Sequence, residues 1–299
     1  MTEKKRLPIR QSLLLLLAAA IWGTAFVAQS VGAEYIGTFT FNCIRNLIGS
    51  LVLLPVIVIF GKRKGASGNQ DISEKVGIAP HKMLWLGGVC CGVILFLASN
   101  LQQYAIEFTS VGKAGFITAL YIVIVPVFGI FLKKPAGAKV WVSVLLSVAG
   151  LYLLCMKERF GMGKGEWLLL LGAVLFAAHI LVIDYFVAFN NGVQMACIQF
   201  LTCGVLSGIF MFLLETPSWS AIFSAIVPIL YAGVMSCGVA YTLQIVGQKG
   251  MNPTVCSLLL SMESVFSVLA GFVILGQALS IRELFGCVIM FVAILLAQF

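Results

Sequence analysis

The chain has 299 residues, of which 61% are hydrophobic and 10% are charged, and its formal net charge is +8. Soluble domains carry about 25% charged residues, so this composition excludes a soluble globular protein. The longest hydrophilic interruption runs only from Gly61 to Lys82, which leaves no room for a soluble catalytic domain. The positive charges stand in short loops beside apolar runs, as in membrane proteins, and we therefore expect no nucleic-acid partner.

A membrane-spanning helix needs about 20 mostly apolar residues, and in lipid its backbone must satisfy its own hydrogen bonds. The apolar runs, separated by polar residues, Gly and Pro, predict an all-α integral membrane protein in contact with lipid. The first run continues past Trp22 to Val31, too far for a signal-peptide core, so we expect it to be retained. The ten predicted helices span residues 11–31, 38–60, 83–105, 111–132, 139–156, 167–188, 193–214, 222–246, 254–275 and 282–298.

Lysine and arginine are distributed unequally between alternate loops, and this bias predicts orientation. The loops around Glu34 and Glu107 carry neither residue, whereas the fifth loop is basic and argues against the orientation that the first half favours. We expect both termini on the cytoplasmic side of a bacterial cytoplasmic membrane, because three segments in the first half are basic: the N-terminal tail (Lys4, Lys5, Arg6, Arg10), the second loop (Lys62, Arg63, Lys64, Lys75, Lys82) and the fourth loop (Lys133, Lys134, Lys139).

The chain also matches itself in two places. Residues 41–45 lie over 195–199 at an offset of 154, which also sets Trp22 against Phe176, and residues 98–102 lie over 240–244 at an offset of 142. The longer loop at 61–82 accounts for the difference between the offsets. We interpret the chain as two repeats of five helices, residues 1–156 and 157–299. An odd number of helices per repeat inverts the second repeat relative to the first, which is the architecture on which alternating access is built.

Five segments of the chain carry a family pattern: Ala20–Phe26, Ala114–Tyr121, Val148–Leu151, Leu258–Phe266 and Ile274–Ser280. They resemble the EamA repeats of the drug/metabolite transporter superfamily, over nearly the whole chain. The resemblance implies ten helices, cytoplasmic termini and transport, often outward, of small organic solutes such as amino acids. It also implies a cavity lined mainly by helices 1, 3, 4, 6, 8 and 9. The chain departs from the usual pattern at Ser264 and Gln277, so no particular substrate carries over.

The sequence indicates neither a metal site nor a cofactor. The nine cysteines are scattered through apolar segments without CxxC or Cys/His ligand spacing. Gly161–Gly165 lacks the spacing of a phosphate-binding loop, and no ATP-binding module is recognisable. We therefore expect a transporter driven by gradients, and not an enzyme.

Polar side chains in mid-helix are the candidate contacts for a solute. A charge at the bilayer centre costs roughly 2.5 to 3.5 kcal/mol, so it needs a partner, a wet cavity or a neutral form. Glu263 can bind a substrate ammonium group or carry a coupling proton; alternatively it ties helices together. His179 can accept a proton or face the solute, or simply pack. The other candidates, each of which can instead bond or pack between helices, are Trp22, Asn100, Gln102, Tyr121, Tyr241 and Gln244.

Other residues are expected to have structural or gating roles. Arg45 can attract a carboxylate, but with Asn42 beside it we favour a structural hydrogen-bond network in a peripheral helix 2. Pro126 and Pro228 each remove a backbone donor and are expected to kink helices 4 and 8.

Two other classes of protein compete with the transporter. A membrane-embedded enzyme acting on lipids or isoprenoids needs clustered acids, histidines or metal ligands, and only His81 and His179 are present, far apart in sequence. A membrane scaffold or sensor needs no polar cavity, so changes at Glu263 or Gln102 should leave it working. The sequence leaves substrate identity, direction, coupling ion and oligomeric state open.

Overall fold

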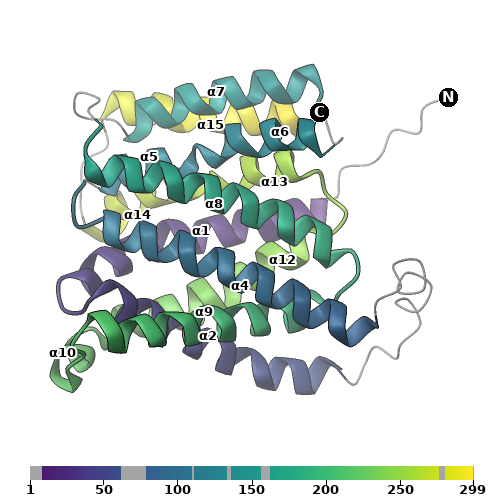
Figure 1. Cartoon of the computed structure of the whole chain (residues 1–299). Helices are drawn as coiled ribbons and strands as arrows, with labels where there is room; N and C mark the ends of the chain where they lie inside the picture. The colour runs from purple at the N-terminus through teal and green to yellow at the C-terminus, as the bar shows by residue number, and fades with distance from the viewer. Residues whose placement is uncertain are drawn as a thin grey trace.

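The computed structural model describes residues 9–61, 79–109, 111–132, 136–155, 162–275 and 280–298, and this part of the chain is helical without strands. The helices lie side by side in one bundle (Figure 1). Their bounds are α1 Ile9–Ala33, α2 Thr38–Gly61, α4 Pro80–Ala105, α5 Val111–Ala119, α6 Tyr121–Phe131, α7 Ala138–Cys155, α8 Lys164–Val187, α9 Gly192–Leu214, α10 Trp219–Ser224, α11 Ile226–Leu230, η1 Tyr231–Tyr241, α12 Thr242–Gln248, α13 Pro253–Leu260, α14 Glu263–Leu275 and α15 Ile281–Gln298.

The predicted all-helical membrane fold is confirmed. Within the described residues, nine helical segments are long and apolar enough to cross a membrane. The tenth predicted helix, at 282–298, is present as α15. The helix α1 begins, and α15 ends, at the same end of the bundle (Figure 1).

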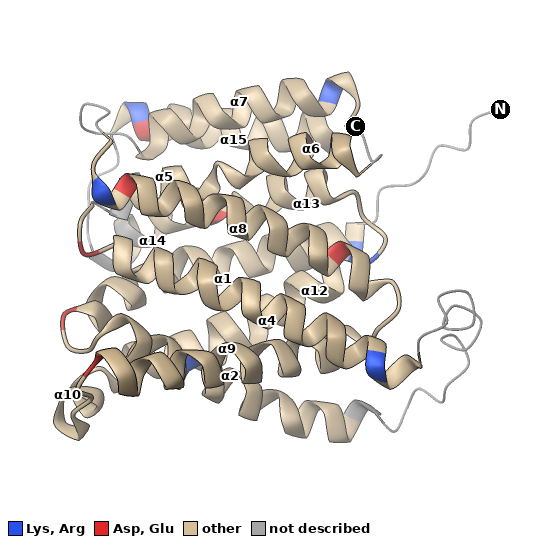
Figure 2. Cartoon of the chain, viewed as in Figure 1, with Lys and Arg blue, Asp and Glu red and all other residues tan. Residues whose placement is uncertain are grey.

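The bundle is apolar outside and partly polar inside, as expected of a protein whose solvent is lipid. Phe131, Phe212 and Val273 are each at least 76% exposed on its outer surface. Lysine, arginine and acidic residues lie mainly at the two ends of the bundle (Figure 2). Among the buried charged residues, Glu166 and Glu283 lie in the first turns of α8 and α15, whereas Arg45 and Glu263 lie inside the bundle.

Equivalent helices of the two repeats pack against each other. The helix α2 lies on α9, α7 on α15, and α6 on α13. In addition, the third helix of each repeat packs against the first helix of the other repeat: α4 against α8, and η1 with α12 against α1. This arrangement of two inverted five-helix repeats places six of the ten predicted helices around the centre. They are α1, α4, α5 with α6, α8, η1 with α12, and α13 with α14.

Two helices that we predicted as continuous are broken in the middle. Residues 111–132 form α5 and α6 with a break at Leu120, and residues 254–275 form α13 and α14 with a break at Ser261 and Met262. At both breaks the amides bond to carbonyls three residues back: Leu120 N to Ile117 O, and Met262 N to Leu259 O. These are the tighter turns typical of interrupted helices.

The residues around the two breaks differ. Pro126 lies buried within α6, six residues after Leu120, and its missing backbone donor removes the hydrogen bond that would otherwise reach the Ile122 carbonyl. In the second repeat no proline stands near the break. Instead the hydroxyls of Ser257 and Ser261 each bond to a carbonyl three residues back at 2.8 Å, a contact that bends helices.

The predicted helix 222–246 is also irregular. Pro228 is the third residue of the short helix α11, directly after a break at Ala225. The chain then forms η1, an 11-residue π-helix with wider turns than an α-helix. Such wide turns frequently occur at functional sites. Here they bring Ser236 and Tyr241 to the centre of the bundle.

Candidate functional site

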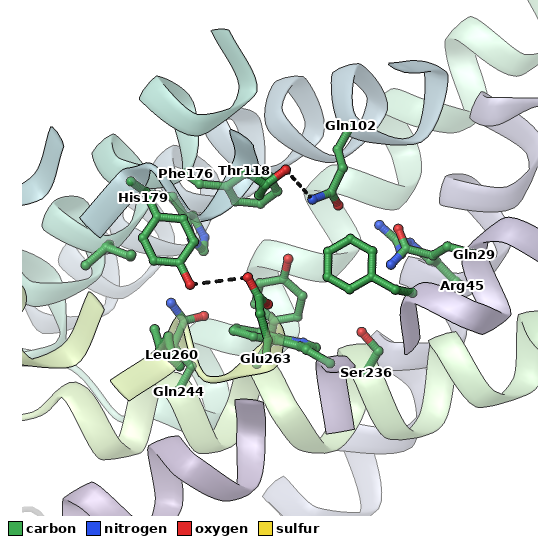
Figure 3. A pocket seen from close by; sticks show the side chains of 15 residues that line it. Gln29, Arg45, Gln102, Thr118, Phe176, His179, Ser236, Gln244, Leu260 and Glu263 are labelled. Atoms are coloured by element: carbon green, nitrogen blue, oxygen red, sulfur yellow. Dashed lines mark hydrogen bonds between the residues drawn. The ribbon is translucent and has the colours of Figure 1, made fainter. Parts of the chain in front are cut away.

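A cavity at the centre of the bundle is the main candidate site. The space between its lining atoms amounts to about 550 Å³ when the open space at its mouth is counted. Figure 3 shows side chains from both repeats pointing into it. Seven of the eight predicted solute contacts line it: Trp22, Gln102, Tyr121, His179, Tyr241, Gln244 and Glu263.

Glu263 and Tyr121 meet across the cavity. The Tyr121 hydroxyl donates a hydrogen bond to the Glu263 carboxylate at 3.3 Å (Figure 3). Each residue is the first of the second half of a broken helix, α6 for Tyr121 and α14 for Glu263. Glu263 is 6% exposed, and within the described residues this is the one hydrogen bond of its carboxylate. The carboxylate therefore has spare acceptor capacity toward the cavity.

Arg45 also lines the cavity, which differs from the structural hydrogen-bond network that we expected for it. Its guanidinium lies 5.5 Å from the centre of the Phe41 ring. The residue is 4% exposed, and its Nε atom has no hydrogen-bond partner in the described part of the chain. The helix α2, which carries Arg45, packs against α9 and η1.

His179 is held from behind by Gln199, the residue that matches Arg45 in the second repeat. The His179 Nε2 and Gln199 Oε1 atoms are 2.9 Å apart, and both residues are buried. Because an amide oxygen only accepts hydrogen bonds, Nε2 donates and Nδ1 is left as an acceptor. No group of three or more His, Cys, Asp or Glu residues in the described chain is placed to hold a metal ion.

Amide and aromatic groups complete the lining. Gln102 donates from Nε2 to Thr118 Oγ1 at 3.2 Å (Figure 3). The Trp22 and Tyr241 rings meet edge to face with centroids 4.5 Å apart. Buried polar groups are normally paired, so unpaired ones at a cavity indicate where a ligand can bind. Within the described residues, the buried lining atoms without a partner are Trp22 Nε1, Gln29 Oε1, Arg45 Nε and Gln244 Oε1.

Asn100 is the predicted contact that does not line the cavity. Its Oδ1 accepts from Asn42 Nδ2 at 2.9 Å, and its Nδ2 donates to Ser207 Oγ at 3.2 Å. This buried network joins α2, α4 and α9 on one side of the cavity. The structural role predicted for Asn42 therefore extends to Asn100.

The cavity follows the repeat symmetry. Tyr121 and Glu263, which bond to each other, are separated by 142 residues, the offset of the second internal match. Adding the offsets of 154 and 142 to the predicted contact residues, or subtracting them, gives further residues that we had not singled out from the sequence. Five symmetric pairs line the cavity: Trp22 with Phe176, Phe26 with Ile180, Gln102 with Gln244, Thr118 with Leu260, and Tyr121 with Glu263.

Comparison with known proteins agrees with this architecture. The model of the EamA-like transporter family matches residues 10–156 and again residues 163–299. The chain belongs to this family. An uncharacterized transporter of Archaeoglobus fulgidus is 27% identical over 285 residues, which cover 95% of this chain and 84% of the relative.

Two more distant proteins are similar over nearly the full chain. The uncharacterized transporter YwfM of Bacillus subtilis is 24% identical over 295 residues, covering 95% of this chain and 92% of the relative. A crystal structure of a protein that is 19% identical superimposes with a TM-score of 0.78 over 96% of each chain, which shows that the fold is shared. The chain is thus a multi-pass membrane protein of a transporter family.

Proposed function

We propose that this protein is a secondary transporter that exports small polar organic solutes, amino acids or similar metabolites, by alternating access. Membership of a transporter family and relatives named as transporters support transport itself. The central cavity supports the solute class, because its lining combines one carboxylate, one guanidinium, amides and aromatic rings. We also propose that the protein is oriented in the membrane with both termini on the cytoplasmic side.

The observation that carries the proposal is the contact between Tyr121 and Glu263. It joins equivalent positions of two inverted repeats at the broken points of their helices. A solute that binds there contacts both repeats, so it can favour one packing of the repeats over the other. We propose that the repeats rock around this contact, and that Glu263 is the residue that carries a coupled proton.

Flux in proteoliposomes tests the proposal. Purified protein is reconstituted, and counterflow of a panel of amino acids and other small metabolites is measured with and without a pH gradient. Glu263→Gln is measured beside Glu34→Gln, a matched change at an exposed loop residue. We expect saturable flux in the wild type and in Glu34→Gln, and lost or pH-independent flux in Glu263→Gln.

The other outcomes are equally informative. Flux that is unchanged in Glu263→Gln would keep the transporter but assign this glutamate to packing. The absence of flux for every solute would contradict the proposed function and favour a membrane-embedded enzyme or a scaffold.

A further inference from the structure

Arg45 places an uncompensated positive charge at the cavity. An arginine at the centre of a membrane helix costs roughly 2.5 to 3.5 kcal/mol on insertion scales. Such residues usually pair with an acidic side chain or with backbone carbonyls. Arg45 is 4% exposed, its guanidinium lies over the Phe41 ring, and its Nε atom has no hydrogen-bond partner within the described residues. An anionic group from a ligand would supply the missing partner.

Gln29 lines the same cavity as Arg45. In Figure 3 both labelled side chains lie on one side of the cavity, opposite the Tyr121–Glu263 bond. Gln29 is 6% exposed, and the Gln103 amide donates to its backbone carbonyl oxygen at 3.1 Å. The side-chain Oε1 atom of Gln29 has no partner within the described residues, and the Nε2 group of the same amide can donate to an anion.

Charge balance indicates which anion fits. Arg45 is the one Lys or Arg, and Glu263 the one Asp or Glu, among the described lining residues. A phosphate dianion would bring more negative charge than this lining can compensate. A carboxylate carries a single charge and matches the planar guanidinium with two parallel hydrogen bonds.

We propose that Arg45 and Gln29 form a subsite for the carboxylate of a small solute, and that Glu263 with Tyr121 receives the ammonium group of the same molecule. A zwitterion satisfies both buried charges at once. The Phe41 ring holds the guanidinium toward the cavity by a cation–π contact. This inference rests on the proposed function for its biological meaning, but solute binding can be measured without transport.

Binding to the purified full-length chain tests the subsite. The probes are the 20 standard L-amino acids, the amide of each, which lacks the α-carboxylate, and the matching deaminated acids. Binding is read as a ligand-induced rise in melting temperature in detergent and as a Kd by titration. The variants are Arg45→Gln, which copies the residue at the matching position of the second repeat, Arg45→Lys, Gln29→Met and the exposed control Arg10→Gln.

We expect at least one amino acid to bind the wild type and its amide to bind at least tenfold more weakly. Arg45→Gln should weaken amino-acid binding at least tenfold and remove the preference over the amide. Arg45→Lys should retain part of the affinity, Gln29→Met should lose several-fold, and Arg10→Gln should match the wild type. Binding of the deaminated acids should weaken in Arg45→Gln but should be unchanged in Glu263→Gln.

Three results would overturn the subsite: no binding of any carboxylate, equal binding of acids and amides, or equal affinity in a folded Arg45→Gln. Folding of each variant is checked by its elution profile and its melting temperature without ligand. Arg45-dependent binding without flux would contradict the transporter and leave the subsite standing. Flux of solutes that lack a carboxylate, at a rate that Arg45→Gln does not change, would support the transporter and contradict the subsite.

Discussion

Individual residues around the cavity divide into those that face it and those that hold the facing residues in place. Glu263, Arg45 and His179 face it, and each is 6% exposed or less. Gln199 fixes the His179 ring, and Asn42 fixes Asn100. The division matters because a substitution of a residue that holds others in place should affect stability more than it affects solute binding.

Removing the Tyr121 hydroxyl tests the contact across the cavity. Tyr121→Phe keeps the ring but deletes the hydrogen bond to Glu263. We expect a loss of about 1 kcal/mol in stability, as is usual for a single hydrogen bond, and a several-fold fall in flux. Thermal unfolding and counterflow measure the two effects. Wild-type flux in this variant would show that the contact plays no part in transport.

The network of Asn42 and Asn100 provides a contrasting case. Asn100→Leu should lower stability by about 1 kcal/mol, because it removes the hydrogen bonds that join Asn100 to Asn42 Nδ2 and to Ser207 Oγ. The apparent KM should stay within about twofold of the wild type, because Asn100 does not line the cavity. A double-mutant cycle with Asn42→Leu gives the coupling energy. A large rise in KM with unchanged stability would return Asn100 to the solute site.

At the scale of the elements, the two broken helices and the π-helix supply six of the fifteen lining residues of the cavity, Glu263 among them. Tyr121 and Glu263 each begin the half-helix after a break, and Tyr241 ends η1. Interrupted helices are tolerated in membranes where they line a cavity, because the freed backbone groups are satisfied there. Regular helices on the outside, such as α7 and α15, form a pair away from this centre.

The close packing of α7 on α15 depends on two glycines. A Cβ atom on Gly286 would lie 2.8 Å from the carbonyl oxygen of Gly150. Gly286→Val should therefore separate the helices and cost about 1 to 3 kcal/mol, measured by thermal unfolding in detergent. Gly137→Ala is the control, since its Cβ would meet nothing within 4 Å. Equal melting temperatures for the two variants would disprove the close-packing interpretation.

At the scale of the whole molecule, the cavity lies between the two repeats. Three equivalent pairs pack against each other: α2 with α9, α7 with α15, and α6 with α13. The proposed alternating access would require these contacts to shift together, so that one end closes while the other opens.

Distances between spin labels at the two ends test this motion. Labels on genetically encoded amino acids at Glu34 and Glu107 report one end, and labels at Lys82 and Lys249 report the other. We expect a transported solute to shift the two distance distributions in opposite directions. Distances that stay fixed at both ends during solute binding would count against alternating access.

The long apolar runs were enough to predict the all-helical membrane fold, because in lipid the backbone of such runs has to form helices. The mid-helix polar and aromatic residues also indicated seven of the fifteen residues that line the cavity, from Trp22 to Glu263. The break points of the helices, the place of Arg45 in the lining and the place of Asn100 outside it became known from the three-dimensional packing. The physical reason is that apolar periodicity does not distinguish a side chain that faces a cavity from one that faces a neighbouring helix; that choice is made by helix rotation and packing between the repeats.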